Sequence, residues 1–127
     1  MRLLLDTHAF LWFVAGDRRL SRRARLAMEA PDAELCLSAA SVWEMAIKAG
    51  LGRLKLPAPV AEYIREKAAG GFRILPVEWM HAAAVETLPF HHRDPFDRLL
   101  AAQSIAEAIP LVTSDPAFKP YGVNIVW

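Results

Sequence analysis

The chain alternates short apolar runs with longer segments of helical periodicity. The apolar runs are bounded by polar or turn-forming residues, as buried strands usually are. They predict strands at residues 2–5, 34–37, 72–75, 111–113 and 123–126. The longer segments have helical spacing or are bounded by capping and helix-breaking residues, and they predict helices at 7–15, 21–30, 38–48, 60–69, 80–88 and 95–108. Short strands alternating with helices favour an α/β fold, in which helices cover both faces of a mainly parallel central sheet of about five strands.

The composition is that of one globular domain, which we expect to span residues 1–127. Hydrophobic residues make up 54% of the chain and charged residues 23%, which excludes intrinsic disorder. The single cysteine, Cys36, excludes a disulfide framework and a multi-cysteine zinc site. No apolar run approaches the length of a membrane span, and Asp6 interrupts the first one, so we expect no signal peptide and a cytoplasmic protein.

Acidic residues recur where predicted strands give way to helices. Asp6 ends the first strand, Asp115 follows the fourth, and Asp94 and Asp97 flank the start of the last predicted helix. Glu44 lies one to two turns into the helix that follows the second strand. Because ligands bind at the carboxyl ends of parallel strands, we expect these acids, which are far apart in the sequence, to converge at one edge of the sheet.

Each acid also has a structural explanation. Asp6, Asp94 and Asp115 are good N-cap residues, and Glu44 fits a capping box with Ser41. Capping does not require an acid, however, and Glu44 sits between apolar neighbours, where a carboxylate is costly without a cation. Oxygen ligands without a cysteine cluster favour Mg²⁺, with Mn²⁺ as the alternative, in the arrangement that hydrolyses phosphodiesters through an activated water.

Five stretches of this sequence resemble, in order, the PIN-domain family and in particular its VapC-type toxins of type II toxin–antitoxin pairs. They are residues 4–8, 38–48, 51–54, 93–103 and 111–118. The resemblance implies a metal-dependent endoribonuclease whose catalytic, metal-binding acids are Asp6, Glu44 and Asp97, with Asp115 as a more variable fourth. It also implies supporting roles for Thr113, the hydroxyl beside the fourth acid, and for Asp94, which we rank first as an N-cap or outer-shell residue and second as a ligand. Ser114 stands where the family usually has Asn.

The partners that the resemblance implies are RNA, a cognate VapB-type antitoxin and a second copy of the chain in a homodimer, with no membrane. The helix predicted at 7–15 is apolar all round, which predicts that it is partly buried in another chain. We expect Trp12 and Trp43 in the core or an interface. Next to Asp6, Thr7 and His8 could contact substrate or a carboxylate.

Positive charge is concentrated in one short segment. Setting the four candidate metal ligands aside leaves ten acidic residues against 15 basic ones, and five arginines fall between positions 18 and 25: Arg18, Arg19, Arg22, Arg23 and Arg25. These arginines form either a solvated helix face or an RNA-binding surface. Arg98, next to Asp97, is predicted to contact the scissile phosphate or to pair with an acid, whereas His91 and His92 are expected to lie in a loop at the rim.

Two other functions fit the same pattern less well. A PIN-like module that binds RNA or a protein without cleaving is disfavoured by the intact acids. A phosphate-handling receiver or phosphatase domain would have paired acids after its first strand, whereas this chain has only Asp6 there, followed by Thr7 and His8.

Overall fold

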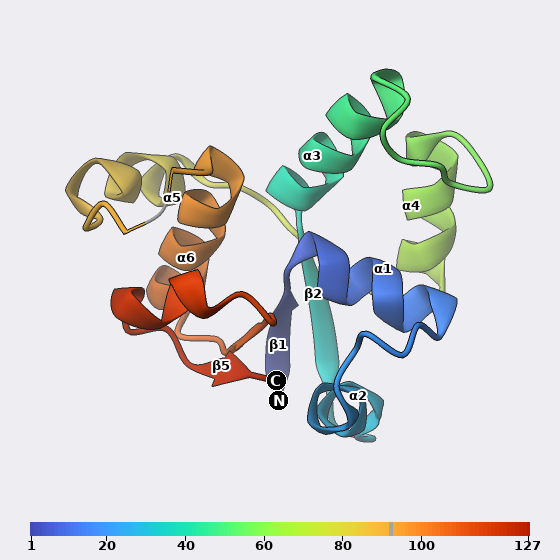
Figure 1. Cartoon of the computed structure of the whole chain (residues 1–127), viewed down its shortest axis with the longest axis horizontal. Helices are drawn as coiled ribbons and strands as arrows, with labels where there is room; N and C mark the ends of the chain where they lie inside the picture. The colour runs from blue at the N-terminus through green and yellow to red at the C-terminus, as the bar shows by residue number, and fades with distance from the viewer. Residues whose placement is uncertain (92) are drawn as a thin grey trace.

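The central sheet has five parallel strands in the order β3-β2-β1-β4-β5 (Figure 1). The strands are β1 (Arg2–Leu5), β2 (Glu34–Ser38), β3 (Arg73–Leu75), β4 (Leu111–Val112) and β5 (Ile125–Val126). The structure is a computed structural model, and it describes residues 1–91 and 93–127. It confirms the predicted α/β fold with a parallel sheet.

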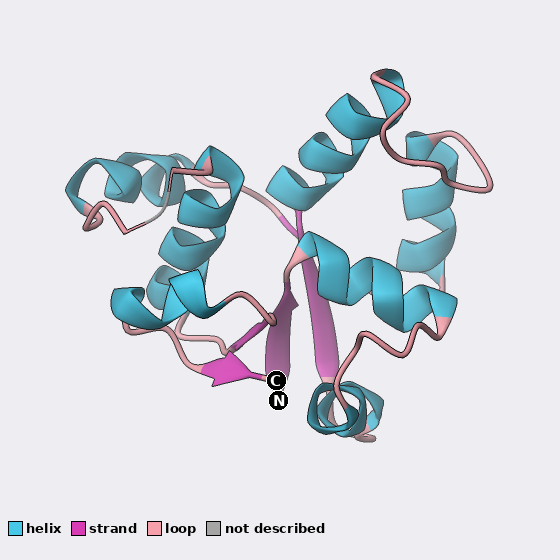
Figure 2. Ribbon diagram, in the orientation of Figure 1, coloured by secondary structure: helices cyan, strands magenta, loops and turns pink. Residues whose placement is uncertain are grey.

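Helices connect the strands (Figure 2). The α-helices are α1 (Thr7–Ala15), α2 (Arg22–Glu29), α3 (Ala39–Gly50), α4 (Val60–Ala69), α5 (Trp79–Ala84) and α6 (Pro95–Glu107), and two short 3₁₀ helices are η1 (Val85–Thr87) and η2 (Pro116–Tyr121). Within the described part of the chain, no helix combines the length and apolar character needed to cross a bilayer.

The sheet is buried on both faces, which explains why its strands are continuously apolar. Successive side chains of a strand point to opposite faces. Leu3 and Leu5 therefore pack with residues of α1, α2, α3 and α4, whereas Leu4 packs with residues of α6 and η2. Figure 1 shows the same division, with α1 to α4 on one side of β1 and β2 and with α5 and α6 on the other.

Most predicted boundaries lie within one or two residues of those in the structure, and the larger differences concern the later part of the chain. The helix predicted at 80–88 is instead α5 followed by the separate 3₁₀ turn η1. Thr113 lies beyond β4, and β5 is shorter than predicted. The sequence analysis does not predict the helix η2, although it identifies Asp115 as a good N-cap residue.

The apolar helix α1 is half-buried in its own chain, where Leu11, Trp12, Phe13 and Val14 pack against the core. Its burial by a second chain stays a prediction. Trp43 is not a core residue, since it is 61% exposed. Its ring meets the Phe96 ring in a T-shaped arrangement, with 5.1 Å between ring centroids.

Candidate active site

The acids meet where the chain reverses its direction of travel across the sheet. From β1 the chain passes through α1 and α2 to β2 on one side, and from β3 it returns through α5 and α6 to β4 on the other side of β1. Such a switch point between neighbouring parallel strands leaves a crevice at their carboxyl ends. Asp6 directly follows β1, and Asp115 follows β4 by three residues.

A pocket of about 140 Å³ occupies this position, and we call it the acid pocket. Its lining combines five carboxylates with one lysine and three other polar side chains: Asp6, Thr7, His8, Glu44, Lys48, Asp94, Asp97, Ser114 and Asp115. The structure thus brings together all four predicted acids, and it adds Asp94 to them. Residues separated by up to 109 positions in the sequence line one cavity.

Asp6 is buried and serves as the N-cap of α1, because its Oδ1 accepts a hydrogen bond of 2.7 Å from the Ala9 amide. Burial raises the pKa of the Asp6 carboxyl and outweighs the opposing hydrogen bonds from Thr113 and Ala9; His8 lowers this pKa further, and Asp115 raises it. The charged form of Asp6 is therefore costly at this desolvated position, and a cation bound beside it would offset that cost.

Glu44 is buried on α3 and is held at both of its oxygens. The Thr7 hydroxyl donates to Oε1 at 2.6 Å, and the Lys48 ammonium donates to Oε2 at 2.7 Å. Lys48 lies one helical turn beyond Glu44, at the spacing where side chains of a helix meet. Sequence reasoning did not place Lys48 in the site, although this spacing was the signal that could have found it.

The other acids combine capping with a place in the pocket. Asp94 caps α6 by accepting from the Phe96 amide at 2.9 Å, and Asp115 caps η2 by accepting from the Ala117 amide at 2.9 Å. The amide of Asp115 donates to the Thr113 hydroxyl at 3.0 Å. Asp97 lies in the first turn of α6. Capping therefore positions the carboxylates of Asp94 and Asp115 and is compatible with their place in the pocket.

The donor chemistry of the acid pocket fits a hard divalent cation, because carboxylate oxygens dominate its lining. Within the described residues, however, no group of three or more His, Cys, Asp or Glu side chains is arranged to hold a metal ion as it stands. The Lys48 ammonium already provides a positive charge at Glu44. Binding a cation would therefore require the carboxylates to close around it.

Arg98 is not at the acid pocket, which corrects the prediction that it meets a phosphate or an acid. Its side chain is buried and donates to the backbone carbonyls of Val85, Leu88 and Pro89 at 3.1–3.2 Å, and it also lies over the Phe90 ring. The guanidinium has five donors, which suits it to cross-link the turn between η1 and α6.

The five clustered arginines differ in their contacts. Arg19 pairs with Asp17 at 2.8 Å, which lowers the pKa of Asp17 to about 2. Arg25 donates to the Asp17 carbonyl and lies 3.7 Å from Glu29. The remaining three, Arg18, Arg22 and Arg23, are exposed.

The histidines are also separated. His8 is exposed on α1 and stacks on Trp12, with 5.6 Å between ring centroids. His91 packs its edge against Tyr121, whereas His92 lies outside the described residues. Of these, His8 lines the acid pocket.

Two grooves adjoin the acid pocket. The larger, of about 530 Å³, runs along α1 and shares His8 with the pocket; we call it the aromatic groove because Trp12 and Tyr63 line it. The second, of about 410 Å³, shares Ser114 and Asp115 with the pocket; we call it the basic groove because Arg23 and Lys119 line it.

The protein is thus an α/β domain with helices on both faces of a parallel sheet and with carboxylates at its switch point. Domains of this class bind ligands at that position. The family model of the PIN domain matches residues 3–123, so the chain belongs to the PIN-domain family. Ribonuclease VapC22 of Mycobacterium tuberculosis is 36% identical to it over 120 residues, which are 94% of this chain and 91% of that protein.

Solved structures share the fold. The crystal structure of VapBC2 from Rickettsia felis, bound to a DNA fragment from their promoter, matches with a TM-score of 0.71 and 16% identity, over 98% of this chain and 97% of that one. FitAcB from Neisseria gonorrhoeae matches with a TM-score of 0.67 and 20% identity, over 97% and 95% of the two chains. At these identities the likeness concerns the fold.

Proposed function

We propose that this chain is a metal-dependent endoribonuclease that acts as the toxin of a type II toxin–antitoxin pair. The observation that carries the proposal is the acid pocket, in which Asp6, Glu44, Asp97 and Asp115 line one cavity at the switch point of the sheet. Membership of the PIN-domain family and 36% identity to a named ribonuclease support it.

We assign Asp6 and Asp97 as direct ligands of Mg²⁺, with Mn²⁺ as the alternative, and we assign Glu44 and Asp115 to complete the site directly or through water. When bound, the cation would supply Lewis-acid activation of water and would neutralise charge on the phosphate oxygens. The raised pKa of Asp6 and the choice of oxygen donors support this assignment.

The chain's own residues prepare this site. The Ala9 amide and the Thr113 hydroxyl orient Asp6, and the Thr7 hydroxyl fixes one oxygen of Glu44. Lys48 compensates the charge of Glu44 and reduces repulsion among the acids before a cation binds. Such fixed hydrogen bonds to ligands hold a site in a productive geometry at little cost during the reaction.

The partners follow from the same proposal. We expect RNA as substrate, a VapB-type antitoxin as inhibitor, a homodimer as the assembled form and the cytoplasm as the compartment. The solved structures that share the fold support an antitoxin partner, because they are of VapBC2 and FitAcB. The exposed apolar side chains of Trp43 on α3 and of Leu51 directly after it support an interface with another chain.

The test is cleavage of RNA by the purified chain, followed by analysis of the new ends. We expect cleavage that EDTA abolishes and that Mg²⁺ restores, with 5′-phosphate and 3′-hydroxyl ends, because water rather than the ribose 2′-hydroxyl attacks. The matched control is Asp97→Asn, which keeps the shape of the side chain. Ends carrying a 2′,3′-cyclic phosphate, or undiminished cleavage by the control, would exclude this mechanism. RNA binding without cleavage would favour a non-catalytic module.

A further inference from the structure

The basic groove adjoins the acid pocket, because Ser114 and Asp115 line both. It lies between α2, which contributes Arg23, and η2, which contributes Lys119. A ligand seated in this groove therefore lies next to the carboxylates that we assign to catalysis.

Its two cations are not neutralised by other parts of the described chain. Neither Arg23 nor Lys119 forms an ion pair within 4.0 Å among the residues that the structure describes. Both side chains are exposed. This distinguishes Arg23 from Arg19 and Arg25, whose charges are satisfied by Asp17 and Glu29. The two cations of the groove can therefore pair with an external anion.

Apolar and aromatic side chains also line the groove, together with Thr113, Ser114 and Asp115 at its border with the acid pocket. Ile125 and Trp127 are half-buried beside the cations, and the Trp127 ring contacts Trp12 at 5.9 Å between centroids. An aromatic surface next to two cations matches the chemistry of a nucleotide, which presents a stacking base and an anionic phosphate.

We propose that the basic groove holds the RNA strand on one side of the scissile bond. Arg23 and Lys119 bind a backbone phosphate, and the Trp127 surface packs against the attached nucleoside. This proposal rests on the proposed ribonuclease function and narrows it. Arg23 and Lys119 would attract the RNA backbone to a pocket of carboxylates that would otherwise repel RNA.

The charge pattern favours RNA over an acidic peptide as occupant. A peptide held by Arg23 and Lys119 would meet the carboxylates of the acid pocket at the shared edge formed by Ser114 and Asp115. An RNA strand can span that edge, with its scissile phosphate at the proposed metal site and the neighbouring phosphate over the two cations.

Binding is measured first, in the Asp97→Asn chain, so that no cleavage interferes. The probe is a short fluorescent single-stranded RNA, followed by anisotropy at several salt concentrations. Arg23→Ser and Lys119→Ser are each expected to weaken binding about tenfold. Each should also reduce the slope of log K against log salt concentration by about 0.7, because one phosphate contact is lost. The control Arg65→Ser removes an exposed cation of α4 that lies outside the groove and should leave both values unchanged.

Turnover is measured next, in the active chain. Arg23→Ser and Lys119→Ser should raise KM while kcat stays within about twofold, since neither residue contacts the reacting atoms. Arg22→Ser, on the same helix but outside the groove, should have a smaller effect than Arg23→Ser. Thermal unfolding confirms that each variant folds.

The inference would be overturned if Arg23→Ser and Lys119→Ser bound RNA and turned it over like Arg65→Ser. Equal effects of Arg22→Ser and Arg23→Ser would also overturn it, because they would indicate a diffuse electrostatic surface. Loss of antitoxin binding with unchanged RNA binding would likewise overturn it, in favour of a protein partner. Failure of the ribonuclease proposal is distinguishable, because the unsubstituted chain would then not cleave RNA.

Discussion

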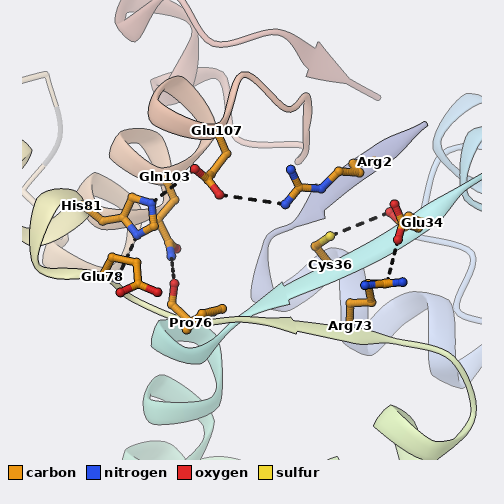
Figure 3. A network of polar contacts seen from close by, with 9 residues as sticks. All are labelled: Arg2, Glu34, Cys36, Arg73, Pro76, Glu78, His81, Gln103 and Glu107. Carbon is orange, nitrogen blue, oxygen red and sulfur yellow. Dashed lines mark hydrogen bonds and ion pairs between the residues drawn. The ribbon is translucent and has the colours of Figure 1, made fainter.

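Two groups of ionisable side chains in this molecule are built in opposite ways. The acid pocket gathers carboxylates at the carboxyl ends of β1 and β4, with Lys48 as the cation that contacts one of them. The second group, which we call the mixed-charge network, comprises side chains of α5, α6, β1, β2 and β3 (Figure 3). It alternates acids and bases: Arg2, Glu34, Arg73, His81 and Glu107, with Gln103 beside them.

The mixed-charge network is satisfied within the chain. Glu107 lies 4.0 Å from Arg2 and 3.8 Å from His81, whose Nδ1 accepts a hydrogen bond from the Glu78 amide. Buried Gln103 accepts from the Ser38 hydroxyl at 2.6 Å and donates to the Pro76 carbonyl at 3.2 Å. Such a group holds elements together and needs no ligand, whereas carboxylates crowded together need a cation from outside.

The largest expected difference between the two groups is in activity. Asp97→Asn and Asp6→Asn should each reduce RNA cleavage at least about 100-fold, since even outer-shell partners of a metal commonly contribute 10- to 100-fold. Stability should change by less than about 1 kcal/mol, because each substitution removes a repulsive charge and asparagine at position 6 can still cap α1. Cleavage rates and urea unfolding measure the two effects; a variant that loses activity only by unfolding would contradict the assignment.

In the mixed-charge network we expect a substitution to reduce stability and to leave activity unchanged. Gln103→Met keeps the side-chain volume but deprives the Ser38 hydroxyl and the Pro76 carbonyl of their partner, which should reduce the free energy of unfolding by about 1–3 kcal/mol. The activity per folded molecule should stay unchanged at a temperature where the variant is folded. Urea unfolding with a parallel cleavage assay checks this, and a stable but inactive Gln103→Met chain would place Gln103 in the site.

A smaller effect on stability is expected from Lys48, the lysine that pairs with Glu44 in the acid pocket. Lys48→Met removes the cation that contacts Glu44 but keeps the aliphatic side chain. Since the lysine side chain is 41% exposed, the metal-free chain should lose less than about 1 kcal/mol of stability. Added Mg²⁺ should then stabilise this variant more than it stabilises the unsubstituted chain, because it replaces the missing charge. Equal stabilisation by Mg²⁺ would show that Lys48 does not compete with the cation.

The smallest effect belongs to the exposed part of the mixed-charge network. The Arg73 and Glu34 side chains approach to 2.6 Å but are 70% and 43% exposed, so solvent screens their attraction. Arg73→Gln should change stability by less than about 0.5 kcal/mol in chemical unfolding and leave cleavage unchanged. A loss above about 1 kcal/mol would mean that this pair anchors β3 to β2.

The acids were predictable because position and residue type agree. Asp6, Asp94 and Asp115 each stand at the start of a helical segment, where a capping carboxylate is fixed by local backbone, and the parallel topology then brings these starts together. Local sequence patterns were therefore enough to predict these acids and the five strands.

Other features depend on contacts that no local pattern records. Arg98 was predicted at a phosphate from its place beside Asp97, but on α6 the two side chains diverge and Arg98 turns to the carbonyls of the preceding turn. The five clustered arginines look equivalent in the sequence, and only the fold places Arg23 beside the acid pocket. The exposure of Trp43 likewise depends on which face of α3 the sheet covers.

The central claim is that the acid pocket binds a divalent cation, and thermal unfolding with increasing Mg²⁺ at constant ionic strength tests it most directly. A cation that binds the folded chain alone should raise the unfolding midpoint of the unsubstituted chain by at least about 2 °C at saturation. Glu107→Gln, in the mixed-charge network, should show the same rise, whereas Asp97→Asn should show little or none. An unchanged midpoint in the unsubstituted chain, or an equal rise in Asp97→Asn, would contradict the account.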